Sequence, residues 1–257
     1  MKTAIIGAGN MGGAIARGLT QGTLIKAKDI IVSDLNNEIL GTLKAFNPNI
    51  QTTNNNQEAI SHAEMIIIAV KPWLVREVVE QLTFDFSKQI IVSIAAGIPF
   101  SDYKEWLSPS ATTFRLVPNT AISQLASMTL IASMNATKEQ ETFIFNLFNE
   151  MGLAMLIPEK HIPATTALTS CGIAYVLKYI QAAMQAGVEM GIYPKDAMKM
   201  VAQSVKGAAE LILHNDTHPS VEIDKVTTPG GITIKGINEL EHGGFSSTVI
   251  KAIKASC

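Results

Sequence analysis

A glycine-rich segment near the N-terminus constrains the fold more than any other feature of this chain. Gly7, Gly9 and Gly12 form the pattern GxGxxG directly after the apolar run TAII and directly before a helical pattern. In such a strand-turn-helix unit the first glycine permits a tight turn, the second lets the backbone approach a pyrophosphate, and the third lets the helix pack on the strand. The segment therefore predicts a dinucleotide-binding βαβ unit.

Residues 1–157 continue this pattern, because short β-branched runs alternate with amphipathic stretches. Runs that are apolar on both faces are typical of parallel strands covered by helices on both sides. We therefore expect an α/β fold with a doubly wound, Rossmann-type sheet, and we interpret the polar segment TTNNNQ as a surface loop. The expected strands are TAIIG, IIVSD, MIIIAV, IIVSIAA, TTFRLV, SMTLIAS and LAMLIP.

Residues 158–257 differ, since after Pro158 and Pro163 they contain only helical patterns, which predicts a second, all-α domain. The polar residues of its two longest helices each form one narrow stripe. A helix that is apolar around most of its circumference must be buried on most of it, so we expect a homodimer built on these helices. The alternative is a monomeric bundle in which they are central. The stripes are Lys178, Gln181, Gln185 and Glu189, then Asp196, Lys199, Gln203, Lys206 and Glu210.

Composition excludes several classes of function. The net charge of -2 and the lack of a Lys/Arg block disfavour nucleic acid as a partner. There is no apolar run long enough for a membrane span and no signal-peptide pattern, so we expect a cytoplasmic protein. The histidines and the two cysteines, Cys171 and Cys257, have no metal-ligand spacing, and no metal site is expected. No motif of a hydrolase is present.

The ends of the expected strands supply candidate cofactor contacts, because these ends line the ligand crevice of a doubly wound sheet. Asp34 ends the second strand at the position where an acidic residue bonds an adenosine ribose, which favours NADH over NADPH. The alternative is that Asp34 caps a helix beginning near Asn36. Lys71 follows another strand in AVKP, and the loops SIAAG and RLVPNT follow two more.

A second glycine cluster lies in the segment TTPGGIT near residue 230. Gly230 and Gly231 precede a helical pattern, so backbone amides and the helix dipole would make an anion site suited to a substrate carboxylate. Thr228 and Thr233 flank this turn with hydroxyl groups. The alternative is ordinary capping by Thr228, with Pro229 at the first helical position.

Taken in this order, GAGNMGGAIARGL, AVKP, SIAAG, RLVPNT and TTPGGIT resemble the pyrroline-5-carboxylate reductase family over essentially the full chain. The resemblance implies reduction of 1-pyrroline-5-carboxylate to L-proline by hydride transfer from NADPH, with NADH possible, in the biosynthesis of proline. It also implies a Rossmann domain, an all-helical dimerisation domain and a homodimer, with a ring of dimers such as a decamer as a further expectation.

The resemblance also assigns residues. The substrate turn is Thr228 to Thr233, with contacts from Gly230, Gly231 and Ile232, and the Thr233 hydroxyl is the expected catalytic partner of the ring nitrogen. The expected cofactor contacts are Gly7, Ala8, Gly9, Asn10, Met11, Gly12, Ser33, Asp34, Asn56, Val70, Lys71, Pro72, Ala95, Ala96, Gly97 and Asn119.

One segment departs from the family pattern. The family carries an Asp and then SGSGPAY, whereas this chain has Pro163 and then TSCGIAY at residues 169–175. A non-catalytic, dinucleotide-binding regulatory protein is therefore one alternative. A β-hydroxyacid dehydrogenase is another, although Lys178 is followed by Gln181 where a KxxN-like setting would have Asn, and the turn TPGGIT would remain unexplained.

Overall fold

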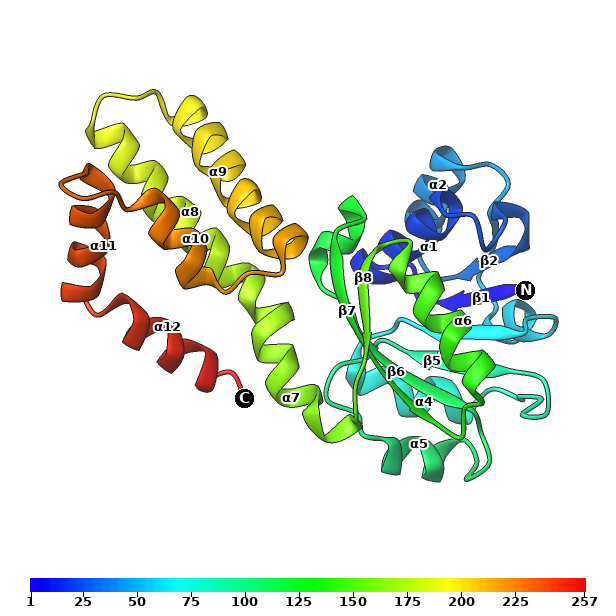
Figure 1. Ribbon diagram of the computed structural model, residues 1–257. Helices are drawn as coiled ribbons and strands as arrows, with labels where there is room; N and C mark the ends of the chain where they lie inside the picture. The colour runs from blue at the N-terminus through cyan, green and yellow to red at the C-terminus, as the bar shows by residue number, and fades with distance from the viewer. The chain divides into compact units, whose positions relative to one another are not determined.

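The protein is described by a computed structural model that covers residues 1–257, and it divides into two compact units, Met1–Ser170 and Cys171–Cys257. The first unit is built on one eight-stranded sheet in the order β3-β2-β1-β4-β5-β6-β7-β8 (Figure 1). Its strands are β1 Thr3–Ile6, β2 Ile30–Ser33, β3 Gln51–Thr53, β4 Met65–Ile68, β5 Ile90–Ser93, β6 Thr113–Val117, β7 Ser127–Met134 and β8 Gly152–Leu156.

All neighbouring strands of this sheet are parallel except β6 and β7, which are antiparallel. The strand order reverses direction at β1 and β4, which is the doubly wound topology expected from the sequence. The helices of the unit are α1 Asn10–Gln21, α2 Asn37–Phe46, α3 Asn56–Ile60, α4 Val75–Glu80, α5 Phe100–Trp106, α6 Lys138–Asn149 and α7 Ile162–Thr166.

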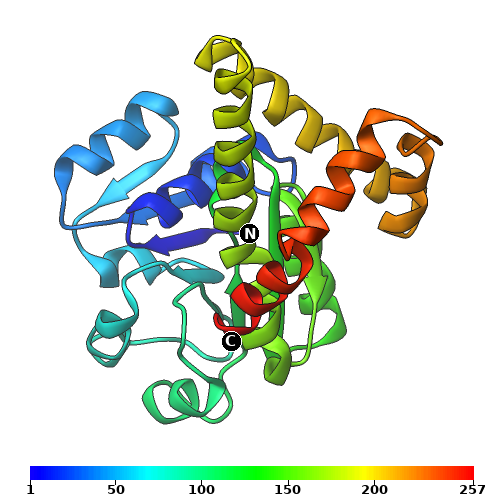
Figure 2. The same ribbon diagram turned by 90° about the vertical axis from the view of Figure 1, so that its left-hand side faces the viewer.

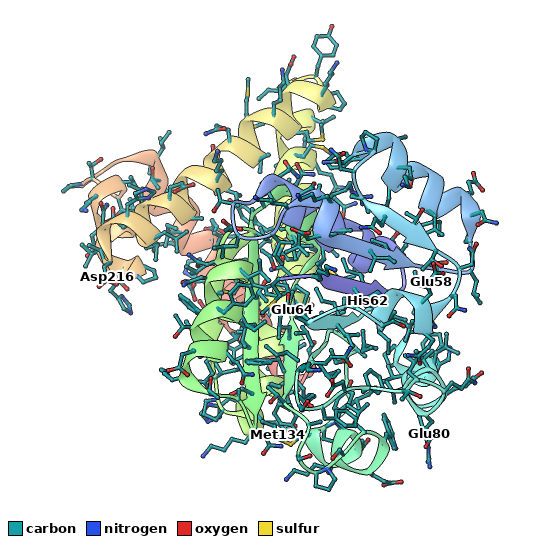
Figure 3. All side chains as sticks on the ribbon, turned by 90° about the vertical axis from the view of Figure 1, so that its right-hand side faces the viewer. Glu58, His62, Glu64, Glu80, Met134 and Asp216 are labelled. Atoms are coloured by element: carbon teal, nitrogen blue, oxygen red, sulfur yellow. The ribbon has the colours of Figure 1, made fainter.

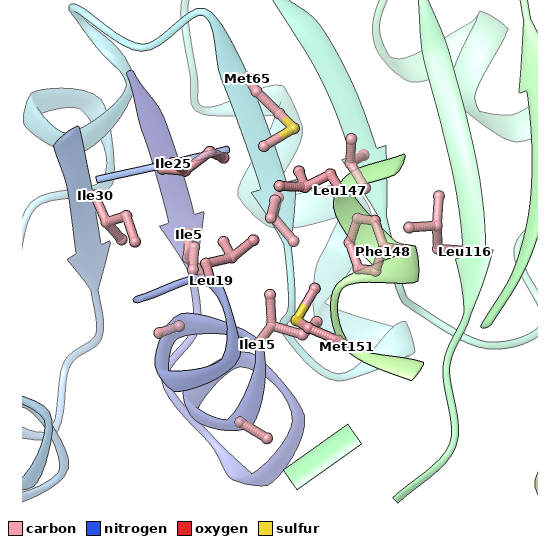
Figure 4. Close-up of a cluster of buried hydrophobic side chains, with 14 of the residues drawn as sticks. Ile5, Ile15, Leu19, Ile25, Ile30, Met65, Leu116, Leu147, Phe148 and Met151 are labelled. Atoms are coloured by element: carbon pink, nitrogen blue, oxygen red, sulfur yellow. The ribbon is translucent and has the colours of Figure 1, made fainter. Parts of the chain in front are cut away.

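Two buried apolar clusters cover the two faces of the sheet. One contains Ile5 of β1 with Ile15 of α1 and Phe148 of α6 (Figure 4). The other contains Ile6 of β1 with Tyr103 of α5. Successive residues of a strand point to opposite faces, so the uninterrupted apolar run of β1 fills both clusters at once.

The segment TTNNNQ is not simply a loop: the expectation was wrong for its first two residues, which belong to β3, and for its last two, Asn56 and Gln57, which begin α3. Gln51, Thr52 and Thr53 form β3 and pair with Ile31, Val32 and Ser33 of β2. None of the three is buried, because β3 lies at the edge of the sheet. Its hydrogen bonds to β2 therefore define the strand without any apolar pattern in the sequence.

The second unit is entirely helical, as expected, and Figure 2 shows its helices from yellow to red. The breaks between helices fall at residues 190–193, 216–218, 227–231 and 243–244, and each contains a glycine or is followed directly by a proline. The helices are α8 Gly172–Glu189, α9 Pro194–Asn215, α10 Pro219–Val226, α11 Ile232–His242 and α12 Phe245–Lys254.

The boundary between the compact units lies after Ser170, which is later than the boundary we expected after residue 157. Ile162 of α7 is buried in the second apolar cluster of the sheet domain. The side-chain amide of Asn119 also donates to the carbonyl oxygen of Thr169 at 3.1 Å. These contacts hold the segment after Pro158 against the sheet, up to the π-helical turn Ala167–Cys171 that precedes α8.

The long helices of the second unit have almost no core within a single chain. Only Gly187 of α8 and Ala197 of α9 are buried. Large apolar side chains remain open, among them Leu177, Met200 and Leu213, which are 58%, 58% and 68% exposed. A monomeric bundle would bury such residues, so this burial pattern disfavours the monomeric alternative.

Two further findings concern partners. None of the helices is both long enough and apolar enough to cross a bilayer. No group of three His, Cys, Asp or Glu side chains is arranged to hold a metal ion.

Candidate active site

The first glycine turn joins β1 to α1, and steric contacts require two of its glycines. Gly7 has a φ of 99°, and a Cβ atom there would stand 2.9 Å from the carbonyl oxygen of Ala69. A Cβ atom on Gly12 would stand only 2.0 Å from the carbonyl oxygen of Gly7. The Gly7 amide donates to the carbonyl oxygen of Ser33 at 2.8 Å, which ties the turn to β2. The turn is therefore fixed by close backbone packing.

The same turn leaves room for an anion at the start of α1. Gly9 is the N-cap residue, and nothing lies within 4 Å of the position of its missing Cβ. The first turn of α1 carries no acidic side chain. The first amides of a helix have no acceptor within the helix, and the helix dipole favours negative charge there. Because of this open cradle of backbone amides, the residues present fit the pyrophosphate of a dinucleotide.

The ends of β2 and β3 place three of the expected cofactor residues together. The Ser33 hydroxyl donates to Oδ1 of Asn56 at 2.7 Å. Oδ2 of Asp34 accepts from the backbone amide of Ala8 at 2.7 Å. Asp34 is not the N-cap of α2, because Asn36 holds that position and accepts from Glu38 and Ile39. The capping interpretation of Asp34 is therefore wrong.

The loop after β4 lies against the glycine turn. A side-chain methyl of Val70 is 3.2 Å from the position that a Gly7 Cβ would take. Lys71 is exposed and is the N-cap of a 3₁₀ turn that begins at Pro72. Because β1 and β4 are neighbouring parallel strands, this loop and the glycine turn lie at one edge of the sheet.

The loop Ala95 to Gly97 follows β5 and is supported by a contact that the sequence did not reveal. The Ser93 hydroxyl lies 2.5 Å from the hydroxyl of Tyr103 and accepts from the Ala95 amide at 3.2 Å. Burial raises the pKa of Tyr103 to about 12, so this phenol stays protonated at neutral pH. Gly97 has a φ of 79°, and both Ala96 and Gly97 are exposed. The small residues of SIAAG predicted the loop, but nothing in the sequence indicated that Tyr103 contacts Ser93.

Asn119, after β6, is almost fully buried, with 4% exposure. Its Oδ1 accepts from the Ala121 amide, and its amide nitrogen donates to the Thr169 carbonyl. The side chain thus links the rim of the sheet to the divergent segment that begins at Thr169. The sequence indicated the position of Asn119 on the rim but not this partner.

The second glycine turn, in the helical unit, has a different construction. Gly231 is the N-cap of α11, and no side chain caps this helix. Pro229 lies before the helix, so the expectation that Thr228 caps it with Pro229 at the first helical position is wrong. Gly230 has a φ of 70°, and the Gly231 amide donates to the Thr228 carbonyl at 2.9 Å.

This turn also leaves free amides at a helix start. The first turn of α11 has no acidic side chain, and its second residue, Thr233, is exposed. Ile232, the first residue, is 86% exposed. A Cβ atom on Gly231 would stand 2.7 Å from the Thr228 hydroxyl, so glycine keeps the turn tight. Such a turn can bind a carboxylate by the same physics as the first turn binds phosphate.

Two family models match the chain. The model described as pyrroline-5-carboxylate reductase dimerisation matches residues 159–257, so the helical unit carries a dimerisation domain. The model described as NADP oxidoreductase, coenzyme F420-dependent, matches residues 2–97, which include the first glycine turn.

Relatives of known name match almost the whole chain. Pyrroline-5-carboxylate reductase 2 of Dictyostelium discoideum is 38% identical over 98% of this chain and 90% of that protein. Pyrroline-5-carboxylate reductase 1 of the same organism is 36% identical over 98% of this chain, and the chain spans 48% of its length. The solved structure of Plasmodium falciparum pyrroline carboxylate reductase with NADP bound has 27% identity and a TM-score of 0.89, covering 100% of this chain and 95% of that one. The chain belongs to the pyrroline-5-carboxylate reductase family, whose members are NAD(P)H-dependent reductases.

Proposed function

We propose that this chain reduces 1-pyrroline-5-carboxylate to L-proline with a hydride from NAD(P)H. The observation that carries the proposal is the pair of glycine turns, each of which places free amides at the start of a helix without an acidic side chain. One turn would take the pyrophosphate of the cofactor and the other the carboxylate of the substrate. The two alternatives, a non-catalytic regulator and a β-hydroxyacid dehydrogenase, are not favoured by the relatives.

The sheet unit would hold the cofactor. Amides from Gly9 to Gly12 bind the pyrophosphate, and Asp34 and Asn56 face the adenosine ribose, with the buried Ser33 holding Asn56 through its hydroxyl. The loops at Val70 to Pro72 and Ala95 to Gly97 face the nicotinamide half, with Asn119 holding the neighbouring loop in place. A bound reduced nicotinamide supplies the hydride, so the protein's task is to orient the reactants.

The helical unit would hold the substrate. Amides of Gly231 and the first residues of α11 bind the carboxylate, and the Thr233 hydroxyl, which is exposed, hydrogen-bonds to the ring nitrogen. That bond strengthens as the nitrogen gains electron density during reduction. No nucleophilic side chain is needed, because the hydride forms the new C–H bond at the imine carbon, the C=N π bond breaks, and the nitrogen takes its proton from water.

We also propose that the chain works as a homodimer through its helical unit. The apolar faces that a single chain leaves open and the match to a dimerisation domain support this assembly. A ring of dimers and location in the cytoplasm remain parts of the proposal.

Oxidation of NADH and NADPH in the presence of 1-pyrroline-5-carboxylate tests the activity. We expect loss of absorbance from the reduced nicotinamide together with formation of proline. A purified chain that binds either dinucleotide but forms no proline would support the regulatory alternative. Reduction of NAD with a β-hydroxy acid, without proline formation, would support the dehydrogenase.

A further inference from the structure

Asp34 is held in one position by the backbone on both sides of it. Its Oδ2 accepts from the Ala8 amide in the first glycine turn at 2.7 Å, and its Oδ1 accepts from the Asn36 amide at 2.9 Å. A carboxylate oxygen has two lone pairs, so each oxygen keeps one acceptor site free. The carboxylate is therefore fixed at the end of β2 and can still accept hydrogen bonds from a ligand.

The residues that flank Asp34 in β2, in the first turn of α2 and in β3 supply no positive charge. Residues 30–43 and 45–70 contain neither Lys nor Arg. The side chain next to Asp34 is Leu35, which is 88% exposed, and the first turn of α2 carries the acidic Glu38. The remaining polar side chains at the ends of β2 and β3 are neutral: Ser33, Asn36, Asn37, Asn54, Asn55 and Asn56.

The cations nearest in the sequence are Lys26 and Lys28 before β2 and Lys44 in the last turn of α2, at the far end of that helix from its N-cap Asn36. Lys28 comes just before β2 and lines a small cavity with Lys2 and His62, at the amino ends of the strands. His62, which is labelled in Figure 3, lies just after α3 in the chain. Arg17 of α1 extends beside Gly13, 3.4 Å from the position that a Cβ there would take.

We infer that Asp34 makes this chain prefer NADH to NADPH. The inference rests on the proposed dinucleotide site. A carboxylate at the end of the second strand accepts hydrogen bonds from the hydroxyls of the adenosine ribose. The 2′-phosphate of NADPH would bring a further negative charge beside this carboxylate, and residues 35–43 contain no Lys or Arg to bind it. Asp34 thus favours one cofactor and opposes the other.

Calorimetric titration of the full chain measures this preference without turnover. We expect NADH to bind at least about tenfold more tightly than NADPH, because the extra phosphate meets a fixed like charge. The probes 5′-AMP and 2′,5′-ADP, which lack the nicotinamide, should show the same order. Equal affinities, tighter binding of NADPH, or no binding of either dinucleotide would overturn the inference.

Variants separate the charge of Asp34 from its structural role. Asp34→Asn keeps an acceptor for the Ala8 amide but removes the charge, and we expect the ratio of the two affinities to fall by about tenfold. Asp29→Asn removes the same charge just before β2, at the opposite edge of the sheet, and should leave the ratio unchanged. An unchanged ratio in Asp34→Asn would contradict the role of this residue.

Leu35→Arg keeps the test decisive if Asp34→Asn fails to fold. Leu35 is exposed, so the change leaves the core intact, and an added cation should tighten NADPH binding by about tenfold while NADH binding stays the same. No gain for NADPH would contradict the inferred place of the 2′-phosphate. If NADH binds but 1-pyrroline-5-carboxylate is not reduced, the proposed reaction fails while this inference stands.

Discussion

The two units hold their glycine turns by different means. In the sheet unit, Gly7 and Gly12 lie where any Cβ atom would collide with the backbone of Ala69, just after β4, or of the turn itself. In the helical unit, nothing lies within 4 Å of the position that a Cβ on Gly230 would take, and its φ of 70° is what calls for glycine. The first turn is fixed by packing and the second by local backbone geometry.

The two units also differ in how much of their apolar surface a single chain buries. Strands such as β1 are buried along their whole length within one chain, whereas α11 has no buried residue. The cofactor half of the reaction can therefore be complete in a single chain. The substrate half, by contrast, sits on helices whose apolar faces need a partner. Substitutions in one unit should therefore leave the function of the other unit intact.

The largest effect is expected at Gly12. Gly12→Ala places a Cβ 2.0 Å from the Gly7 carbonyl oxygen, so we expect a loss of about 2 to 4 kcal/mol in the free energy of unfolding and loss of dinucleotide binding. Gly41→Ala is the matched control, because nothing lies within 4 Å of its Cβ position in α2. Urea unfolding measures both, and a Gly12→Ala protein as stable as the control would refute packing as the cause.

Charging the apolar face of α8 should separate the subunits. Leu177→Glu puts a carboxylate on a side chain that is 58% exposed in one chain, so the chain should fold but its dimer should weaken by about a hundredfold or more. Gln181→Glu, in the polar stripe of the same helix, is the control. Sedimentation velocity measures both. A wild-type protein that is a monodisperse monomer at micromolar concentration would contradict the proposed association.

A substitution at Thr233 tests the proposed substrate site of the helical unit separately from the cofactor site. We expect Thr233→Ala to lower kcat/KM by about 30- to 150-fold, equivalent to about 2 to 3 kcal/mol of lost transition-state stabilisation. Dinucleotide affinity should not change. Thr248→Ala is a control, because that hydroxyl donates to its own helix at Gly244. Unchanged kcat/KM in Thr233→Ala would remove this residue from the reaction.

Tyr103 gives the smallest effect, and only at high pH. Its folded-state pKa of about 12 is raised by burial above the ordinary value near 10. Stability from the protonated phenol is therefore complete below about pH 10 and is lost as pH rises toward 12, by about 2 kcal/mol at pH 11.5. Tyr103→Phe should remove this loss, and Tyr193→Phe, at an exposed tyrosine, should not. Urea unfolding across this pH range measures it, and identical slopes in the two variants would contradict burial as the cause.

Much of the sheet unit could be predicted because its strands are buried on both faces. The apolar runs of β1, β4 and β5 specify strands, and the GxGxxG segment specifies the turn between β1 and α1. The edge strand β3 was missed because Gln51 to Thr53 are polar and only their pairing with β2 makes them a strand. The amino-acid pattern within a strand does not show which other strand it pairs with.

In the candidate site, backbone features were predictable and side-chain partners were not. The place of Gly230 and Gly231 directly before a helix could be predicted from the sequence, whereas their role as an anion site stays a proposal. The contacts of Asp34 with Ala8 and of Asn119 with Thr169 join residues far apart in the chain, so no spacing rule reveals them. The π-helical turn that ends at Cys171 was not predicted either, since its residues have no distinctive pattern.

The central claim is that the second glycine turn binds the substrate carboxylate. The most direct test compares 1-pyrroline-5-carboxylate with 1-pyrroline, the same ring without the carboxylate, in the wild type and in Gly231→Ala, whose Cβ would stand 2.7 Å from the Thr228 hydroxyl. We predict that the wild type prefers the carboxylate by about a hundredfold in kcat/KM, and that Gly231→Ala lowers only the carboxylate reaction, by about tenfold. Equal losses for both substrates, or no wild-type preference, would contradict the claim.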